Sequence, residues 1–115
     1  MSAAEPVPLV VRHFPMVGAS VFRLSGELDL LAVPELEHRI AGPPRDGVPL
    51  VLDTRDLDFI DSSGLRSILQ LARELRGQGV SLVVLVSDTG PVKTVMDLVG
   101  AWDALDVRAT LSDVI

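Results

Sequence analysis

Two aliphatic runs on either side of one amphipathic segment constrain the fold of this chain most strongly. The runs Val48–Asp53 and Val80–Val86 are almost continuously apolar, which is typical of strands in a parallel sheet that helices cover. Between them, from Ser62 onward, apolar residues recur at every third or fourth position until Gly77 or Gly79. The order strand, helix, strand predicts a right-handed βαβ unit.

The flanking segments extend this unit. Further strands are predicted over Leu9–Phe14, Ala19–Leu24 and Leu105–Val107, and further helices begin at Pro34, at Pro91 and at Leu111. The first two strands form a hairpin, Ser25–Asp29 is a loop, and Gly42-Pro43-Pro44 ends the first helix. We therefore predict one α/β domain over residues 7–115, after a tail of residues 1–6. Its mixed, mostly parallel sheet has an N-terminal antiparallel hairpin and helices packed on it.

Charge and composition exclude several classes of function. The chain has 10 Lys and Arg against 16 Asp and Glu, a formal net charge of −6, and a single Lys, so nucleic acid is not an expected partner. It has no Cys, which excludes disulfides and thiolate chemistry. The first residues lack the features of a signal peptide, and no apolar run approaches the roughly 20 residues that span a bilayer. We expect a cytoplasmic protein without a membrane partner.

Motifs for catalysis are absent. The glycines form neither G-x-G-x-x-G nor G-x-x-x-x-G-K-[ST], and Asp61 stands where a G-x-S-x-G elbow requires its first Gly. The two histidines, His13 and His38, lie on a predicted strand and on an exposed helix face, so a Ser–His dyad has no support from the sequence. We expect no catalytic residue and no cofactor.

A metal site is not expected either. The residues Asp53, Asp56, Asp58 and Asp61 form a loose acidic cluster that lacks the Gly and the Glu of an EF-hand. The sequence favours a solvated acidic loop followed by a helix cap.

Two adjacent serines stand where this loop enters the predicted helix. Either Asp61 or Ser62 is expected to cap the helix, a contribution of about 1 kcal/mol, and we favour Ser62. With one residue as the cap, Ser63 stays free to be modified. Gly64 costs about 1 kcal/mol relative to Ala inside a helix, which suggests that something large approaches the backbone closely at this point.

These residues carry a resemblance to a known family. Phe59–Leu65, with the sequence FIDSSGL, and Gly26-Glu27-Leu28-Asp29 resemble the STAS domain of bacterial anti-sigma factor antagonists. Leu50–Asp53 and Val99-Gly100 stand where that family has similar segments, and the resemblance runs from about Leu9 to Ile115. The chain departs from it in a first helix that ends early and in a final helix that is only a stub.

The resemblance implies a partner switch controlled by phosphorylation. In that family the serine before the glycine, here Ser63, is phosphorylated by the cognate anti-sigma factor, which is an ATP-dependent serine kinase. The unphosphorylated protein binds the anti-sigma factor and so releases the sigma factor, and a phosphatase resets the switch. Asp29 and Asp61 would line the phosphoacceptor pocket, and the partner-binding residues would also include Ser62, Gly64 and Leu65.

Two other functions stay open at this point. The chain resembles STAS domains that serve as scaffold subunits of a stress-signalling or lipid-transport complex. A small hydrolase that uses Ser63 as its nucleophile is a further hypothesis from a different class.

Overall fold

The computed structural model describes residues 7–40 and 47–115. Within them lie the strands β1 (Val10–Met16), β2 (Ala19–Leu28), β3 (Leu50–Ile60), β4 (Leu82–Leu85) and β5 (Asp106–Arg108), the helices α1 (Val33–Ile40), α2 (Ser62–Gly77) and α3 (Pro91–Val99), and the 3₁₀ turns η1 (Trp102–Ala104) and η2 (Leu111–Asp113). The predicted tail of residues 1–6, and Gly42-Pro43-Pro44 as the end of the first helix, fall outside the described residues.

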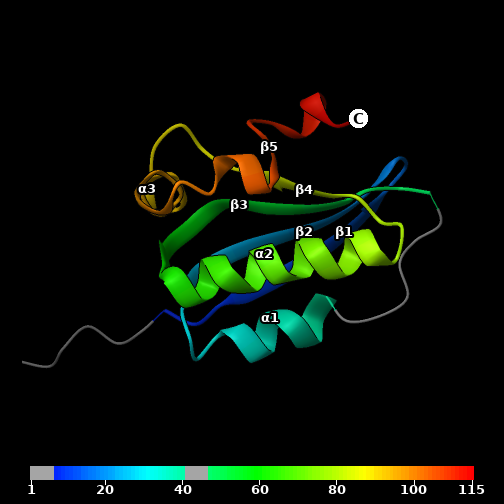
Figure 1. The fold of residues 1–115 in the computed structure, drawn as a ribbon. Coiled ribbons are helices and arrows are strands. Elements are labelled where there is room, and N and C mark those ends of the chain that lie inside the picture. Colours follow the sequence, from blue (N-terminus) through cyan, green and yellow to red (C-terminus); the bar gives the residue numbers. More distant parts are fainter. Residues whose placement is uncertain (1–6, 41–46) are drawn as a thin grey trace, which may run out of the picture.

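The strands form one mixed sheet in the order β1-β2-β3-β4-β5, with β3 in the middle (Figure 1). Only β1 and β2 pair antiparallel, and each later strand is parallel to its neighbour. The α/β fold with an N-terminal hairpin and helices packed on a mostly parallel sheet is therefore confirmed.

Two apolar layers cover the two faces of this sheet. On β4, Leu82 and Val84 belong to the larger core cluster, which also contains buried residues of all three helices. Val83 and Leu85 face the other way, into a smaller cluster against which Leu111 and Val114 pack. The aliphatic run is thus buried on both faces, as its composition indicated, but the described part of the second layer comes from the C-terminal turn.

The strands before the predicted site are longer than the sequence indicated. β2 continues through the expected loop to Leu28, and β3 continues through most of the acidic stretch to Ile60. Between Arg23 and Glu27 the pairing of β2 with β3 shifts twice, so that β3 takes up extra residues as bulges. These bulges interrupt the alternation of apolar and polar residues that identifies a strand, and for this reason the sequence pattern of the acidic stretch predicts a loop.

The C-terminal elements lie where the sequence predicts them, but the last one is shorter than predicted. α3 begins at Pro91 and ends before Gly100, whose φ of 66° is the left-handed conformation that commonly follows a helix. The predicted final helix is only η2, held by a capping box between Thr110 and Asp113. Across residues 7–40 and 47–115, no helix is both long and apolar enough to cross a membrane.

Candidate functional site

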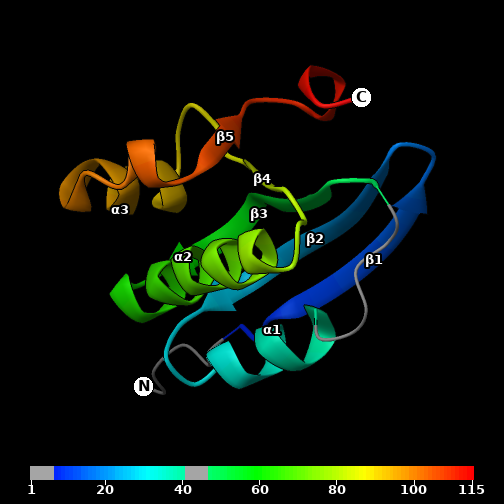
Figure 2. The same cartoon turned by 45° about the vertical axis from the view of Figure 1, so that its right-hand side comes forward.

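The predicted site lies where β2 and β3 end and α2 begins. Leu28 and Ile60 are partners in the last register position of this strand pair, and the amide of Asp61 donates a hydrogen bond to the carbonyl of Leu28 at 3.3 Å. Asp29 and Asp61 each follow one of these paired residues, so the fold brings two predicted site residues together. Figure 2 shows the end of β2 and the start of α2 at the same end of the sheet. We call Leu28, Asp29 and residues 60–64 the α2 corner.

Asp61, and not Ser62, is the N-cap of α2. Its backbone is extended, with φ −106° and ψ −177°, and its carboxylate accepts a hydrogen bond from the amide of Gly64 at 2.8 Å. Ser62 is already the first helical residue and is exposed. Our preference for Ser62 as the cap was wrong, because a carboxylate one residue earlier satisfies the free amide donor of the first turn.

Gly64 is required by close contacts within the domain. A Cβ atom at this position would lie 2.3 Å from the carbonyl oxygen of Leu28 and 2.9 Å from side-chain atoms of Leu28 and Ile60. The object that approaches this backbone closely is therefore the end of β2. The glycine lets α2 begin directly against the sheet, and it is not evidence of a partner.

The two serines differ in their surroundings. Ser62 is exposed and Ser63 is half-buried, and neither hydroxyl has a hydrogen-bond partner among residues 7–40 and 47–115. Ser63 thus has a free hydroxyl in the first turn of α2, beside the capping carboxylate. Gly64 and Leu65 are buried below it, with Leu65 in the larger core cluster.

Asp29 begins the connection from β2 to α1. Its carboxylate accepts a hydrogen bond from the amide of Ala32 at 3.0 Å, and its carbonyl also accepts from that amide. One carboxylate oxygen each of Asp29 and Asp61 is thereby used to shape the corner.

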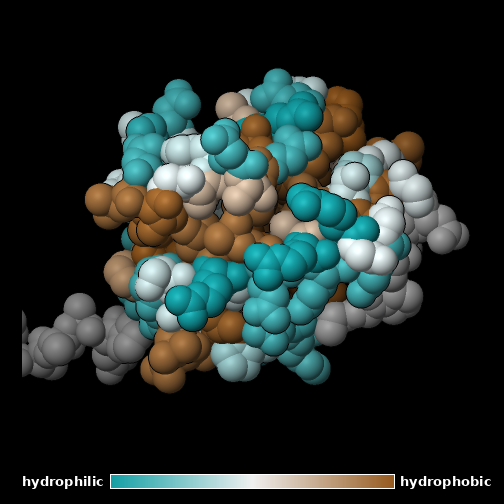
Figure 3. Space-filling model, in the orientation of Figure 1, coloured by the Kyte–Doolittle hydropathy of each residue, from teal (hydrophilic) through white to brown (hydrophobic). Residues whose placement is uncertain are grey.

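Exposed apolar side chains, which the sequence analysis overlooked, accompany the corner. Leu30 and Leu31 directly follow Asp29 and are 66% and 88% exposed, and Phe59 is 45% exposed. Figure 3 shows apolar side chains at the end of the domain where β2 leads into α1. The pair Leu-Leu after Gly-Glu-Leu-Asp was the available sequence signal, because neither leucine fits the apolar stripe of α1.

A second group of charges lies in the middle of β3. Asp53 is only 2% exposed, and its carboxylate accepts hydrogen bonds from Arg55 at 2.9 Å through both Nε and Nη2, and from Arg23 Nε at 3.3 Å. We call these three residues the Asp53 ion cluster. The expectation of a solvated acidic loop was wrong for Asp53, because the strand continues past it.

The charge of Asp53 is stabilised by its partners. Burial alone would raise the pKa of this carboxyl. Hydrogen bonds from the side chain and backbone of Arg55, together with the positive charges of Arg55 and Arg23, outweigh that effect and hold the pKa of Asp53 below its ordinary value. The same hydrogen bonds raise the pKa of Arg55. Asp53 is therefore ionised, and its carboxylate oxygens are bonded to side chains within the domain.

The histidines take no part in the α2 corner. His13 on β1 makes a 2.7 Å hydrogen bond to Ser20 and stacks on Phe22, and His38 lies on α1. Among the described residues, neither histidine is hydrogen-bonded to Ser63. Within the described ranges, His, Asp and Glu form no group of three or more that could hold a metal ion.

Comparisons with known proteins identify the fold. The family model described as "STAS domain" matches residues 10–114. The chain is similar to an anti-sigma factor antagonist from Mycobacterium paratuberculosis, with 26% identity and a TM-score of 0.80, over 97% of this chain and 95% of that one. No curated protein matches the chain.

Two further structures share the fold at lower identity. The anti-sigma factor antagonist SpoIIAA in its unphosphorylated form is 24% identical with a TM-score of 0.65, over 90% of this chain and 91% of its own. A serine-to-glutamate variant of RsbS from Moorella thermoacetica is 20% identical with a TM-score of 0.66, over 90% of each chain.

Proposed function

We propose that this chain, which belongs to the STAS domain family, is an anti-sigma factor antagonist that phosphorylation of Ser63 switches off. In this proposal the chain is not an enzyme: it binds an anti-sigma factor that is also an ATP-dependent serine kinase, and a phosphatase removes the phosphate. The cytoplasm is the proposed location. The main support is the similarity, along nearly the whole chain, to the antagonist from Mycobacterium paratuberculosis.

The geometry of the α2 corner is compatible with a phosphate on Ser63. The residue lies in the first turn of α2, its hydroxyl is unbonded within the described residues, and its backbone stands at the positive end of the helix dipole. A phosphate adds about −1.5 to −2 charges, which a helix N-terminus favours by about 0.3–1 kcal/mol at an exposed position. We therefore expect the phosphorylated domain to stay folded.

The phosphate favours the helix but is expected to weaken the binding of a partner. Asp29 and Asp61 place two carboxylates at the same corner, and a bound partner would exclude water from it. A unit charge about 4 Å from another costs on the order of 4 kcal/mol at an effective dielectric constant of 20. One such repulsion is enough to lower the affinity roughly a hundredfold to a thousandfold.

The exposed leucines offer contact area for such a partner. Leu30 and Leu31 adjoin Asp29, so an apolar contact can lie directly beside the charge-sensitive corner. Binding through Leu30 and Leu31 and release through Ser63 would then occur on one surface.

Binding can be tested with the full chain as bait in its native lysate. We expect the wild type and Ser63→Ala to retain the same anti-sigma factor and Ser63→Asp to lose it, with an affinity roughly 100-fold to 1,000-fold lower for the purified pair. Ser81→Asp is the matched control, because it adds the same charge to an exposed serine at the opposite end of α2. A similar loss for both aspartate variants would contradict a specific role of Ser63.

Phosphorylation is tested separately by mass spectrometry after incubation with the captured kinase and ATP. The phosphate is expected on Ser63 and absent from Ser63→Ala. A phosphate on Ser62 would contradict the assignment. If neither serine is modified and the chain co-purifies in a large particle, the scaffold function replaces the proposal. Ester turnover that disappears in Ser63→Ala would support the hydrolase instead.

A further inference from the structure

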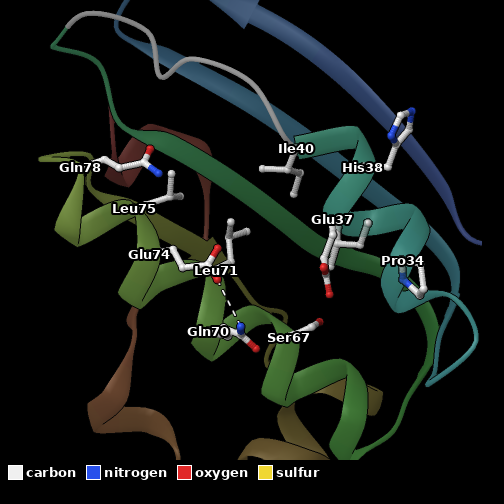
Figure 4. A pocket seen from close by; sticks show the side chains of 11 residues that line it. Pro34, Glu37, His38, Ile40, Ser67, Gln70, Leu71, Glu74, Leu75 and Gln78 are labelled. Carbon is white, nitrogen blue, oxygen red and sulfur yellow. Dashed lines mark hydrogen bonds between the residues drawn. The ribbon is translucent and has the colours of Figure 1, made fainter.

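A cavity of about 600 Å³ lies between α1 and α2, on the side of α2 away from α3 (Figure 4). Its lining comes from two helices that are far apart in the sequence, with Leu36, Glu37 and Ile40 from α1 and Leu71, Glu74 and Leu75 from α2. Its volume falls in the range of roughly 300–1,000 Å³ that is usual for small-molecule sites.

The walls of this cavity combine aliphatic and acidic groups. Leu36 and Leu75 are buried and give it an apolar base. Glu37 from α1 and Glu74 from α2 extend into the space between the helices (Figure 4). Glu74 accepts a hydrogen bond from Gln70 at 3.2 Å, and Glu37 has no ion-pair partner among the described residues. Both carboxylates can thus accept bonds from a ligand.

Positive side chains of the same helices lie elsewhere. Among the described residues, the lining contains no Lys or Arg, and the ring of His38 points away from the cavity (Figure 4). Arg39 is held by Glu35 at 3.0 Å, outside the lining. At about 100° of rotation per residue, Arg66 and Arg73 project roughly a third of a turn away from the side of α2 that lines the cavity. The described walls are therefore acidic around an apolar base.

We infer that this cavity binds a small aliphatic cation, with its hydrocarbon part against Leu36, Leu71 and Leu75 and its ammonium group between Glu37 and Glu74. An ammonium group donates three hydrogen bonds, and its charge attracts both carboxylates of the lining. An anion of the same shape meets two like charges, and a neutral alcohol gains only the apolar contact. The inference does not depend on the role of Ser63.

Three probes with the same carbon chain separate these contributions. We would titrate octylammonium, octanol and octanoate into the ¹⁵N-labelled full chain and follow backbone amide shifts by NMR. Octylammonium is expected to bind with a Kd on the order of 1 mM and to shift amides of residues 35–40 and 67–78. Octanol is expected to bind roughly tenfold more weakly, and octanoate more weakly still.

Conservative variants test the two carboxylates. Glu37→Gln and Glu74→Gln should each weaken octylammonium roughly tenfold and leave octanol unchanged, because each removes one charge and keeps the shape. Glu35→Gln is the matched control, since it also removes a glutamate charge from α1 but outside the cavity. All three positions are exposed, so the variants are expected to fold.

Several outcomes would overturn the inference. Equal affinity for the three probes would make the cavity an unselective apolar surface, and shifts confined to other residues would place the ligand elsewhere. A basic amphipathic peptide that shifts the α1 and α2 amides while octylammonium does not would make the cavity a docking groove for a protein helix. If Glu35→Gln weakened octylammonium binding as much as Glu37→Gln and Glu74→Gln do, the preference for a cation would come from the net charge of the domain and not from the cavity.

Discussion

Asp53 and Asp61 lie eight positions apart around one strand, yet they have different tasks. Asp53 is buried in the middle of β3 and forms hydrogen bonds with two arginines. Asp61 follows the end of β3, stays partly exposed, and caps α2 through the amide of Gly64. One acidic stretch therefore stabilises the fold where the sheet continues and shapes a surface site where the sheet ends.

The largest effect on stability is expected from Gly64→Ala, which tests whether the α2 corner is packed as tightly as the core. Its Cβ atom would lie 2.3 Å from a backbone oxygen that cannot move without disturbing β2. We expect the free energy of unfolding to fall by about 3 kcal/mol, the upper end of the usual cost of overpacking, as measured by urea denaturation.

Gly77→Ala is the matched control at the other end of the same helix. Among the described residues, and apart from the chain neighbours and the backbone of the helix itself, no atom lies within 4 Å of a Cβ built there. Its φ is not positive, so this variant is expected to stabilise the domain by about 0.4–1 kcal/mol. If both alanine variants behaved alike, the close approach of α2 to β2 would not be the reason for the glycine.

Removal of the carboxylate of Asp53 tests the other region. Asp53→Ala deletes hydrogen bonds to two charged groups, and we expect unfolding free energy to fall by about 1.5–3 kcal/mol. The arginines are partly exposed and can be hydrated again, which keeps the loss moderate. Asp56→Ala is the control: that residue is exposed and 4.0 Å from Arg23, and about 0–1 kcal/mol is expected. If both variants lowered the free energy of unfolding equally, the burial of Asp53 would add nothing to the contribution of its ion pairs.

The pH dependence of stability tests the charge of Asp53 with a variant of nearly the same shape. Because the pKa of Asp53 is lower in the folded protein than its ordinary value of 3.8, its contribution is complete above that value and is lost as the pH falls through the folded pKa. Below about pH 4, the wild type should therefore lose stability more steeply than Asp53→Asn. Parallel pH profiles would show that the cluster does not stabilise the ionised form.

The smallest effect is expected at the cap. Asp61→Ala should lower the free energy of unfolding by about 1 kcal/mol, because the amide of Gly64 loses its acceptor, and Asp61→Asn should restore most of it. Ser62→Ala should stay within about 0.5 kcal/mol of the wild type, since that hydroxyl has no partner in the described structure. Thermal denaturation of the three variants distinguishes Asp61 from Ser62 as the cap.

Much of the candidate site could be predicted from the sequence. The block FIDSSGL after an aliphatic run placed two serines at a helix start, and both lie there. The identity of the cap could not be decided, because Asp and Ser are nearly equal as N-caps and their order alone does not show where helical geometry begins. The exposed leucines escaped notice because an apolar pair is usually assigned to a core.

The order of strands and helices could be predicted from local patterns, because aliphatic runs and three-to-four periodicity depend on local burial alone. How the strand ends meet depends on contacts between distant parts of the chain. Pairing of Leu28 with Ile60 extends β3 through the acidic stretch, buries Asp53 between two arginines and presses Gly64 against β2. The contacts of Leu28 with Ile60 and Gly64, and of Arg23 with Asp53, join residues 30 or more positions apart. No local pattern encodes which distant residue a glycine or a carboxylate will meet.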